Sequence, residues 1–246
     1  MANLRANKIV GIGSTDAGTT FDGPISLNTQ GYMYFPTGTT EQRGRGRGLN
    51  GGSSTPSNIT NIDYFQIQST GNSIVFGDLT TSGQHTSCSS ATRGVFAMGG
   101  QSSPGTKQNV IDYVTIATTG NAQDFGDTTN AAEGYLACAS NTRGIFVGGN
   151  VSPSGNVNTI QYVTIASEGD AVDFGDIGSG RVTAQSGAGT SNNLRGVTMG
   201  GFNNPNQYST TMEYVNIDTT GNSFDFGYLS SSRAYTGSCS DSHGGL

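Results

Sequence analysis

Tryptophan is absent from the sequence, and histidine and cysteine are scarce, with only 2 and 3 copies. His85 and His243 have no serine or cysteine nucleophile at the spacing of a known triad. Cys88, Cys138 and Cys239 show no CxxC spacing and cannot all pair within one chain. We therefore predict reduced thiols, no catalytic, cofactor-binding or metal site, and no enzyme activity.

Charged residues make up only 11% of the chain, and their balance gives a formal net charge of -6. This composition disfavours nucleic-acid binding through a basic surface. Arg43, Arg45 and Arg47 alternate with glycine as in RNA-binding tracts, but three arginines leading into a repeat are more often a solvated loop or part of that repeat.

Long apolar runs are also missing. No stretch approaches the roughly 20 apolar residues that a membrane-spanning helix needs. Residues 1–20 lack the uninterrupted apolar segment of a secretion signal. We expect a soluble product that does not insert into a membrane.

Glycine, by contrast, is abundant, at 39 of 246 residues, and Ser, Thr and Asn crowd the segments between short apolar runs. Runs such as 111–116 and 160–165 are rich in β-branched and aromatic residues and end in turn residues. No window shows apolar residues at helical spacing over three turns. The sequence thus predicts an all-β fold of many short strands.

One register aligns four segments of the chain with each other. A tyrosine recurs at intervals of 49, 49 and 52 residues, and a Phe-Gly pair follows each tyrosine at a constant interval of 12. An Arg-Gly pair lies upstream in each segment. These repeat landmarks are Arg47, Arg93, Arg143 and Arg195, then Tyr64, Tyr113, Tyr162 and Tyr214, and finally Phe76, Phe125, Phe174 and Phe226. The constant interval predicts the same substructure in all four copies.

Turn residues divide each copy into strands. A Gly-Asn or Gly-Asp pair, such as Gly120-Asn121, stands between the Tyr and the Phe and predicts a tight hairpin. A Gly-Gly pair ends the strand that begins with Arg-Gly. One more strand of small residues precedes each Arg-Gly after the first. Each unit is therefore expected to form four antiparallel strands.

Four-stranded units of about fifty residues, with a strand ending in Gly-Gly and a Tyr on the next strand, resemble the kelch repeat. A Phe-Gly pair stands where kelch units usually carry tryptophan on the last strand. The resemblance covers the chain from about Arg47 onward. It implies a four-bladed kelch-like β-propeller, because such units bury their faces only by packing on neighbours.

The two ends of the repeat region indicate how the ring closes. The first copy lacks an inner strand before Arg47, and residues 236–241 match one. We expect this C-terminal strand to complete the first blade, either in its own chain or, by swapping, in a neighbouring subunit. If the inner strands surround the axis, Cys88, Cys138 and Cys239 gather there.

The chain therefore divides into an N-terminal arm, 1–42, and a propeller, 43–246. The arm has none of the repeat landmarks, and it is too short for an independent core. We expect it to lie on the propeller or to be ordered by a partner.

The amino-acid sequence of the units resembles that of a family of kelch-like proteins of tailed phages, notably marine cyanophages. The segments that carry this resemblance are 111–122, 124–127, 142–149, 18–23 and the ending 239–246. The resemblance implies a virion structural protein that is assembled in the host cytoplasm. It would be held to other virion proteins of the tail, neck or head through residues 1–42, in multiple copies and as a homo-oligomer.

Two further hypotheses concern binding sites. The alternative function is binding of a host-surface glycan. In that hypothesis the variable loops after the Gly-Gly pairs form the receptor-binding face, and Phe202 and Tyr208 are its aromatic contacts. Asp78, Asp127 and Asp176 follow the Phe-Gly pairs and could form a cation-binding ring, but their recurrence favours turn capping or pairing with an arginine.

Overall fold

The computed structural model describes residues 46–54, 56–67, 69–100, 105–153, 155–178, 187–203 and 207–240. The chain divides into two units, Met1–Pro36 and Thr37–Leu246, and every described residue belongs to the second. The expectations for the arm at 1–42, and those for Arg43, Arg45 and His243, lie outside the described residues.

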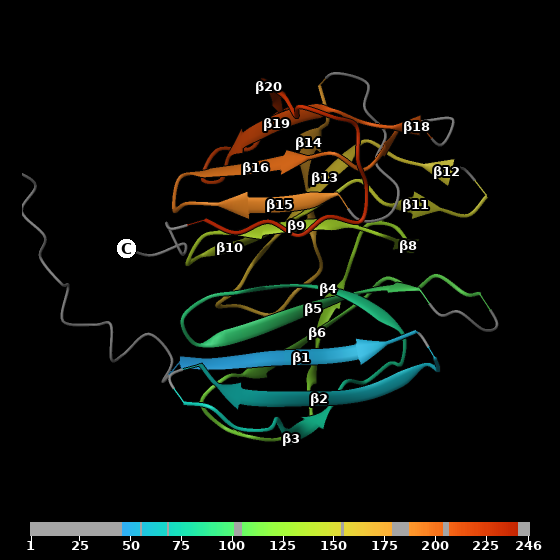
Figure 1. The fold of residues 1–246 in the computed structure, drawn as a ribbon. Helices are drawn as coiled ribbons and strands as arrows, with labels where there is room; N and C mark the ends of the chain where they lie inside the picture. The colour runs from blue at the N-terminus through green and yellow to red at the C-terminus, as the bar shows by residue number, and fades with distance from the viewer. Residues whose placement is uncertain are drawn as a thin grey trace, which may run out of the picture. The chain divides into compact units, whose positions relative to one another are not determined.

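Four antiparallel sheets, which we number I to IV in chain order, make up most of the described chain (Figure 1). Sheet I contains β1 (Arg47–Ser53), β2 (Ile59–Gln66) and β3 (Ile74–Asp78). Sheet II contains β4 (Gln84–Ser89), β5 (Arg93–Gly100), β6 (Val110–Thr115) and β7 (Gln123–Asp127). Sheet III contains β9 (Leu136–Ala139), β10 (Arg143–Val147), β13 (Thr159–Thr164) and β14 (Val172–Asp176). Sheet IV contains β15 (Ala188–Ser191), β16 (Arg195–Met199), β19 (Thr211–Asn216) and β20 (Phe224–Tyr228).

Two small sheets contain the strands that follow the Gly-Gly pairs of the third and fourth units. One joins β8 (Ala132–Glu133), β11 (Asn150–Val151) and β12 (Gly155–Asn156), and the other is the hairpin of β17 (Phe202–Asn203) and β18 (Gln207–Tyr208). The described ranges contain no α-helix, and hence none that is long and apolar enough to cross a membrane. The prediction of an all-β fold with antiparallel sheets is confirmed.

Each main sheet carries a β-bulge at its Phe-Gly pair. In sheet II, Ile111 pairs with Gly126 and Asp112 pairs with Asp124, so Phe125 is the extra residue. The same shift occurs in sheets I, III and IV. A bulge bends its strand and re-aims the side chains beside it, so the recurring Phe-Gly pair marks the same bend in every sheet.

Apolar cores lie between successive sheets. Phe76 of sheet I is buried with Val114 of sheet II, Phe125 of sheet II with Val163 of sheet III, and Phe174 of sheet III with Val215 of sheet IV. Each sheet thus buries one face against the next, as expected of repeats that cannot bury their surface alone.

The first strands of sheets II, III and IV lie side by side. The Thr86 hydroxyl donates to the Tyr135 carbonyl at 3.0 Å, and the Ser191 hydroxyl donates to the Ala139 carbonyl at 2.7 Å. The C-terminal segment 236–240 continues this order, because the Ser238 and Ser240 hydroxyls donate to the Gly189 and Ser191 carbonyls at 2.7 and 3.0 Å.

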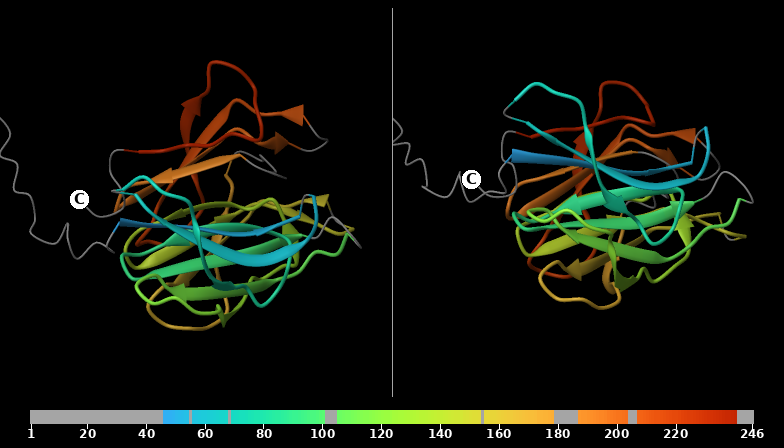
Figure 2. Two further views of the ribbon diagram at one scale, coloured as in Figure 1. Left: turned by 60° about the horizontal axis from the view of Figure 1, so that its bottom comes forward. Right: turned by 90° about the horizontal axis from the view of Figure 1, so that it is seen from below.

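The C-terminal segment therefore occupies the place of an inner strand next to sheet IV. Among the described strands, β1 pairs only with β2, so sheet I has three strands where the others have four. Figure 2 shows sheet I, in blue to teal, and sheet IV, in orange to red, from two further sides. Completion of the first unit by residues 236–241 stays a prediction.

The Gly-Asn and Gly-Asp pairs lie between two antiparallel strands, as predicted, but the prediction of a tight turn there is wrong. In sheet II, β6 ends at Thr115 and β7 begins at Gln123, so a loop of several residues joins them. The Gly120 amide donates to the Phe76 carbonyl of sheet I instead of closing a turn. Contact with the neighbouring sheet, rather than local turn geometry, sets the shape of this loop.

Candidate functional site

The repeat landmarks form the same stack of side chains in all four sheets. The arginine guanidinium lies over the tyrosine ring, 4.9, 4.5, 4.6 and 4.2 Å from its centre in sheets I to IV. The tyrosine and phenylalanine rings pack in a T shape, with ring centres 6.0, 5.8, 5.8 and 6.1 Å apart in sheets I to IV. The arginine over the tyrosine is a favourable cation–π contact, and the T-shaped tyrosine–phenylalanine pair is a favourable aromatic contact.

The same arginine also reaches the following sheet. Arg47 donates from Nη1 to the Ile116 carbonyl at 2.9 Å, Arg93 to the Ile165 carbonyl at 3.1 Å, and Arg143 to the Ile217 carbonyl at 2.9 Å. A charged donor on a carbonyl makes a strong hydrogen bond. Arg47, which sequence reasoning weighed as part of an RNA-binding tract, is thus held at the boundary of sheets I and II.

Hydrogen bonds join the outer strands of sheets I, II and III to the Gly-Asn or Gly-Asp loop of the next sheet. The Gly120 amide donates to the Phe76 carbonyl at 2.9 Å, and the Asp78 amide donates to Asn121 Oδ1 at 3.1 Å. Equivalent bonds link Phe125 and Asp127 to sheet III, and Phe174 and Asp176 to sheet IV. The aspartates considered for a cation ring therefore lie at these boundaries, and their amides bond to the next sheet.

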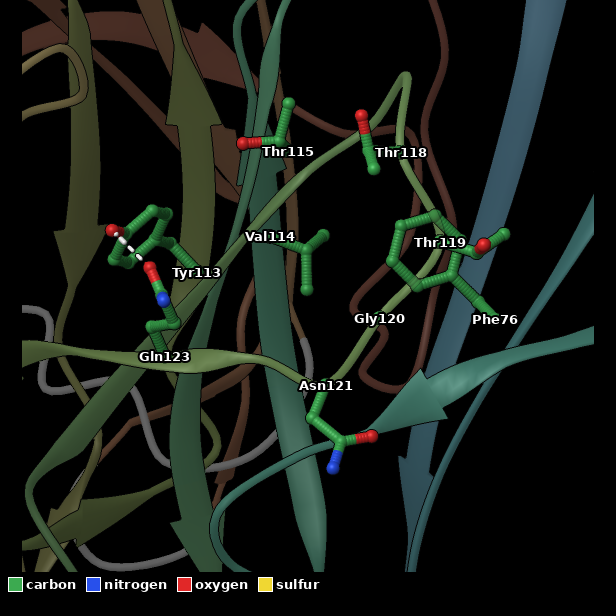
Figure 3. A pocket seen from close by; sticks show the side chains of 9 residues that line it. All are labelled: Phe76, Tyr113, Val114, Thr115, Thr118, Thr119, Gly120, Asn121 and Gln123. Carbon is green, nitrogen blue, oxygen red and sulfur yellow. Dashed lines mark hydrogen bonds between the residues drawn. The ribbon is translucent and has the colours of Figure 1, made fainter.

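Figure 3 shows the first of these boundaries, where a cavity of about 290 Å³ opens between Phe76 and the loop that carries Gly120 and Asn121. Tyr113 forms one wall, and its hydroxyl donates to Gln123 Oε1 at 2.6 Å. The same hydroxyl lies 2.6 Å from Glu168 of sheet III, and this hydrogen bond raises the pKa of Tyr113. Phe76, Gly120, Asn121 and Tyr113 of this cavity thus already make hydrogen bonds between sheets.

Two buried polar side chains hold the turn that precedes the next inner strand. Asp112 accepts hydrogen bonds from the Thr80 amide at 2.8 Å and from the Thr80 hydroxyl at 2.7 Å. Gln161 accepts from the Thr129 amide at 2.7 Å and from its hydroxyl at 3.1 Å. Burial raises the pKa of Asp112, although its bonds to Thr80 oppose that shift. Sequence reasoning missed both residues because their types differ, and their place before the landmark tyrosine was the only signal.

A second cavity, of about 430 Å³, is lined by four segments: β4, β9, β15 and residues 238–240. Cys88, Cys138 and Cys239 all line it, so the thiols gather where the inner strands meet. All three are free cysteines. Within the described ranges, no group of three or more His, Cys, Asp or Glu residues is placed to hold a metal ion.

The three thiols differ in their exposure to solvent. Burial raises the pKa of Cys88 and of Cys138 to about 12, whereas Cys239 is exposed. Because the thiolate is the reactive form, we expect a maleimide reagent at neutral pH to label Cys239 first in a dilute folded sample. Mass spectrometry of labelled peptides measures this order, and Cys239→Ser should remove the fast phase. Equal labelling of the three cysteines before unfolding would contradict the described burial.

No family model and no curated protein matches this sequence. Solved structures do match its fold. One of them, titled "Structure of YjhT", aligns with a TM-score of 0.60 at 11% identity, over 79% of this chain and 71% of that chain. At this identity the likeness concerns the fold alone.

The two residues proposed for glycan contact lie together. Phe202 and Tyr208 face each other across the β17–β18 hairpin, with ring centres 5.1 Å apart. Tyr235 adds a third ring, edge-on to Phe202 at 5.6 Å. Tyr208 and Tyr235 are exposed, and Tyr235 has a positive φ of 57°, which is unusual for a residue other than glycine. Sequence reasoning missed Tyr235 because it lies outside the hairpin, after β20.

Proposed function

We propose that this chain is a non-enzymatic structural protein of a tailed-phage virion, in which the four sheets are the blades of a kelch-like propeller. The arm at 1–42 attaches it to other proteins of the particle. The amino-acid sequence of the repeat units, which resembles that of kelch-like phage proteins, supports this role.

The observation that carries the proposal is that polar side chains at equivalent positions of the repeat make equivalent bonds at successive boundaries. Arg47, Arg93 and Arg143 all bond to a carbonyl of the next sheet. Asp112 and Gln161, although buried and polar, both hold a threonine of the turn that follows the preceding sheet. A catalytic centre breaks the symmetry of its scaffold, whereas these groups repeat with it. The repeated polar groups therefore favour an architectural role.

Deletion of residues 1–42 tests the attachment. We expect particles assembled with the shortened chain to lack it, while the isolated shortened chain unfolds cooperatively like the full chain. Immunoblotting of purified particles measures incorporation, and urea unfolding followed by circular dichroism is the control for folding. Particles that incorporate the shortened chain at the normal level would contradict the role of the arm.

Binding of host-surface glycan is the second candidate, and the aromatic cluster of Phe202, Tyr208 and Tyr235 favours it. Exposed aromatic rings stack on sugars, and a rigid pair of rings loses little entropy on binding. A glycan array probed with the full chain and with Tyr208→Ala tests this function. The variant should lose the signal, while Leu194→Ala, at an exposed position outside the cluster, should keep it. An array without signal for the full chain would count against this candidate.

A further inference from the structure

Two faces of the repeat series resemble the occupied boundaries in sequence, but in the part of the chain that the structure describes they form none of the boundary bonds. The sheet IV face consists of Arg195, Phe226 and Gly227, and the sheet I face consists of Ile67, Gly71 and Asn72. By the spacing of the repeat, these are the groups that would meet at a fourth boundary. None of the boundary bonds of sheets I to IV joins the two faces within the described residues.

The sheet IV face is open where its counterparts are covered. Phe226 is 48% exposed, whereas the equivalent Phe76, Phe125 and Phe174 are 4%, 2% and 3% exposed. A Cβ on Gly77, Gly126 or Gly175 would lie within 2.6 Å of backbone of the next sheet, but one on Gly227 would meet nothing within 4 Å. The Arg195 guanidinium stacks on Tyr214, as the other arginines stack on their tyrosines.

The sheet I face is also open, and it carries the groups that its equivalents use to contact the preceding sheet. Ile67 is 68% exposed, whereas the equivalent Ile165 and Ile217 are 1% and 0% exposed and Ile116 is partly buried. All three of these equivalents accept a hydrogen bond from an arginine of the preceding sheet. Gly71 and Asn72 have the same types as Gly120 and Asn121, which bond to the outer strand of sheet I. This face therefore carries the acceptor and the loop that the sheet IV face would need.

Next to sheet IV, the place of an inner strand is already filled. Residues 238–240 bond to β15 through serine hydroxyls, as β15 bonds to β9. Sheet I, conversely, is the one main sheet without a fourth strand among the described residues. A sheet I docked beside this segment would gain that strand.

We propose that the sheet IV face of one copy binds the sheet I face of a second copy, and that residues 236–240 of the first pair with β1 of the second. The contact extends the boundary that the chain itself builds between sheets I and II, II and III, and III and IV. Since the two faces differ, each copy contacts one neighbour through its sheet IV face and another through its sheet I face. Such head-to-tail contacts give rings or filaments. This inference does not depend on a virion role.

Two variants, each blocked on one face, test the contact. Phe226→Asp places a charge on the sheet IV face, and Ile67→Asp places one on the sheet I face. Analytical ultracentrifugation of the full chain should give a mass above one copy that rises with concentration. Each variant alone should sediment as one copy. An equimolar mixture should give a species of two copies, because one intact face of each kind remains.

Val172→Asp is the matched control, since Val172 is 54% exposed on an outer strand away from both faces. It should assemble like the unmodified chain. Arg195→Ala is a second variant of the sheet IV face, for use if Phe226→Asp does not fold. An unmodified chain that sediments as one copy at every concentration would overturn the proposal in favour of closure within one chain. So would a mixture that stays at one copy.

Discussion

Replacing Phe125 with alanine is expected to lower the free energy of unfolding by about 3–5 kcal/mol. Phe125 is 2% exposed and lies in the core between sheets II and III, with Tyr113 edge-on at 5.8 Å. The truncation leaves a cavity in a boundary that rigid backbone bonds on both sides keep from collapsing. Urea unfolding followed by circular dichroism measures the change.

Val172→Ala provides the control for this prediction. Val172 is an exposed apolar residue of β14, so its truncation should change the free energy of unfolding by less than about 0.5 kcal/mol. A loss of similar size in both variants would show that the boundary between sheets II and III does not bury Phe125 as described.

Gly77→Ala is expected to cost about 1–3 kcal/mol by overpacking. A Cβ at Gly77 would lie 2.2 Å from the Gly120 carbonyl oxygen of sheet II, and backbone cannot move aside as a flexible side chain can. The added methyl would also push apart the Gly120 amide and the Phe76 carbonyl, which are bonded at 2.9 Å. Thermal and urea unfolding of the variant measure the loss.

In a sample dilute enough to contain single copies, Gly71→Ala is the matched substitution, because a Cβ at Gly71 meets no atom within 4 Å. Its free energy of unfolding should stay within about 0.5 kcal/mol of the unmodified chain. If Gly77→Ala proves as mild as Gly71→Ala, sheets I and II do not approach each other as closely as the structure has them.

Much of the candidate site depends on contacts that the sequence pattern does not encode. The arginine, tyrosine and phenylalanine landmarks were recognisable because their types and spacing repeat. Asp112 and Gln161 were not recognisable, because the same position of the repeat holds a carboxylate in one unit and an amide in another. Both side chains nevertheless accept a hydrogen bond from a threonine amide. Tyr235 contacts Phe202 because the chain after β20 returns to the β17–β18 hairpin, which the sequence pattern does not show.

The sequence by itself determined that the chain is all-β and built of four like units, because strand patterning and landmark spacing are local properties. Tertiary structure alone decided that the Gly-Asn loop docks on the preceding sheet, and that Phe226 is half exposed where its three equivalents are buried. Both depend on which surfaces meet between segments about fifty residues apart. Identical residues are covered or left open according to whether a neighbouring sheet is present.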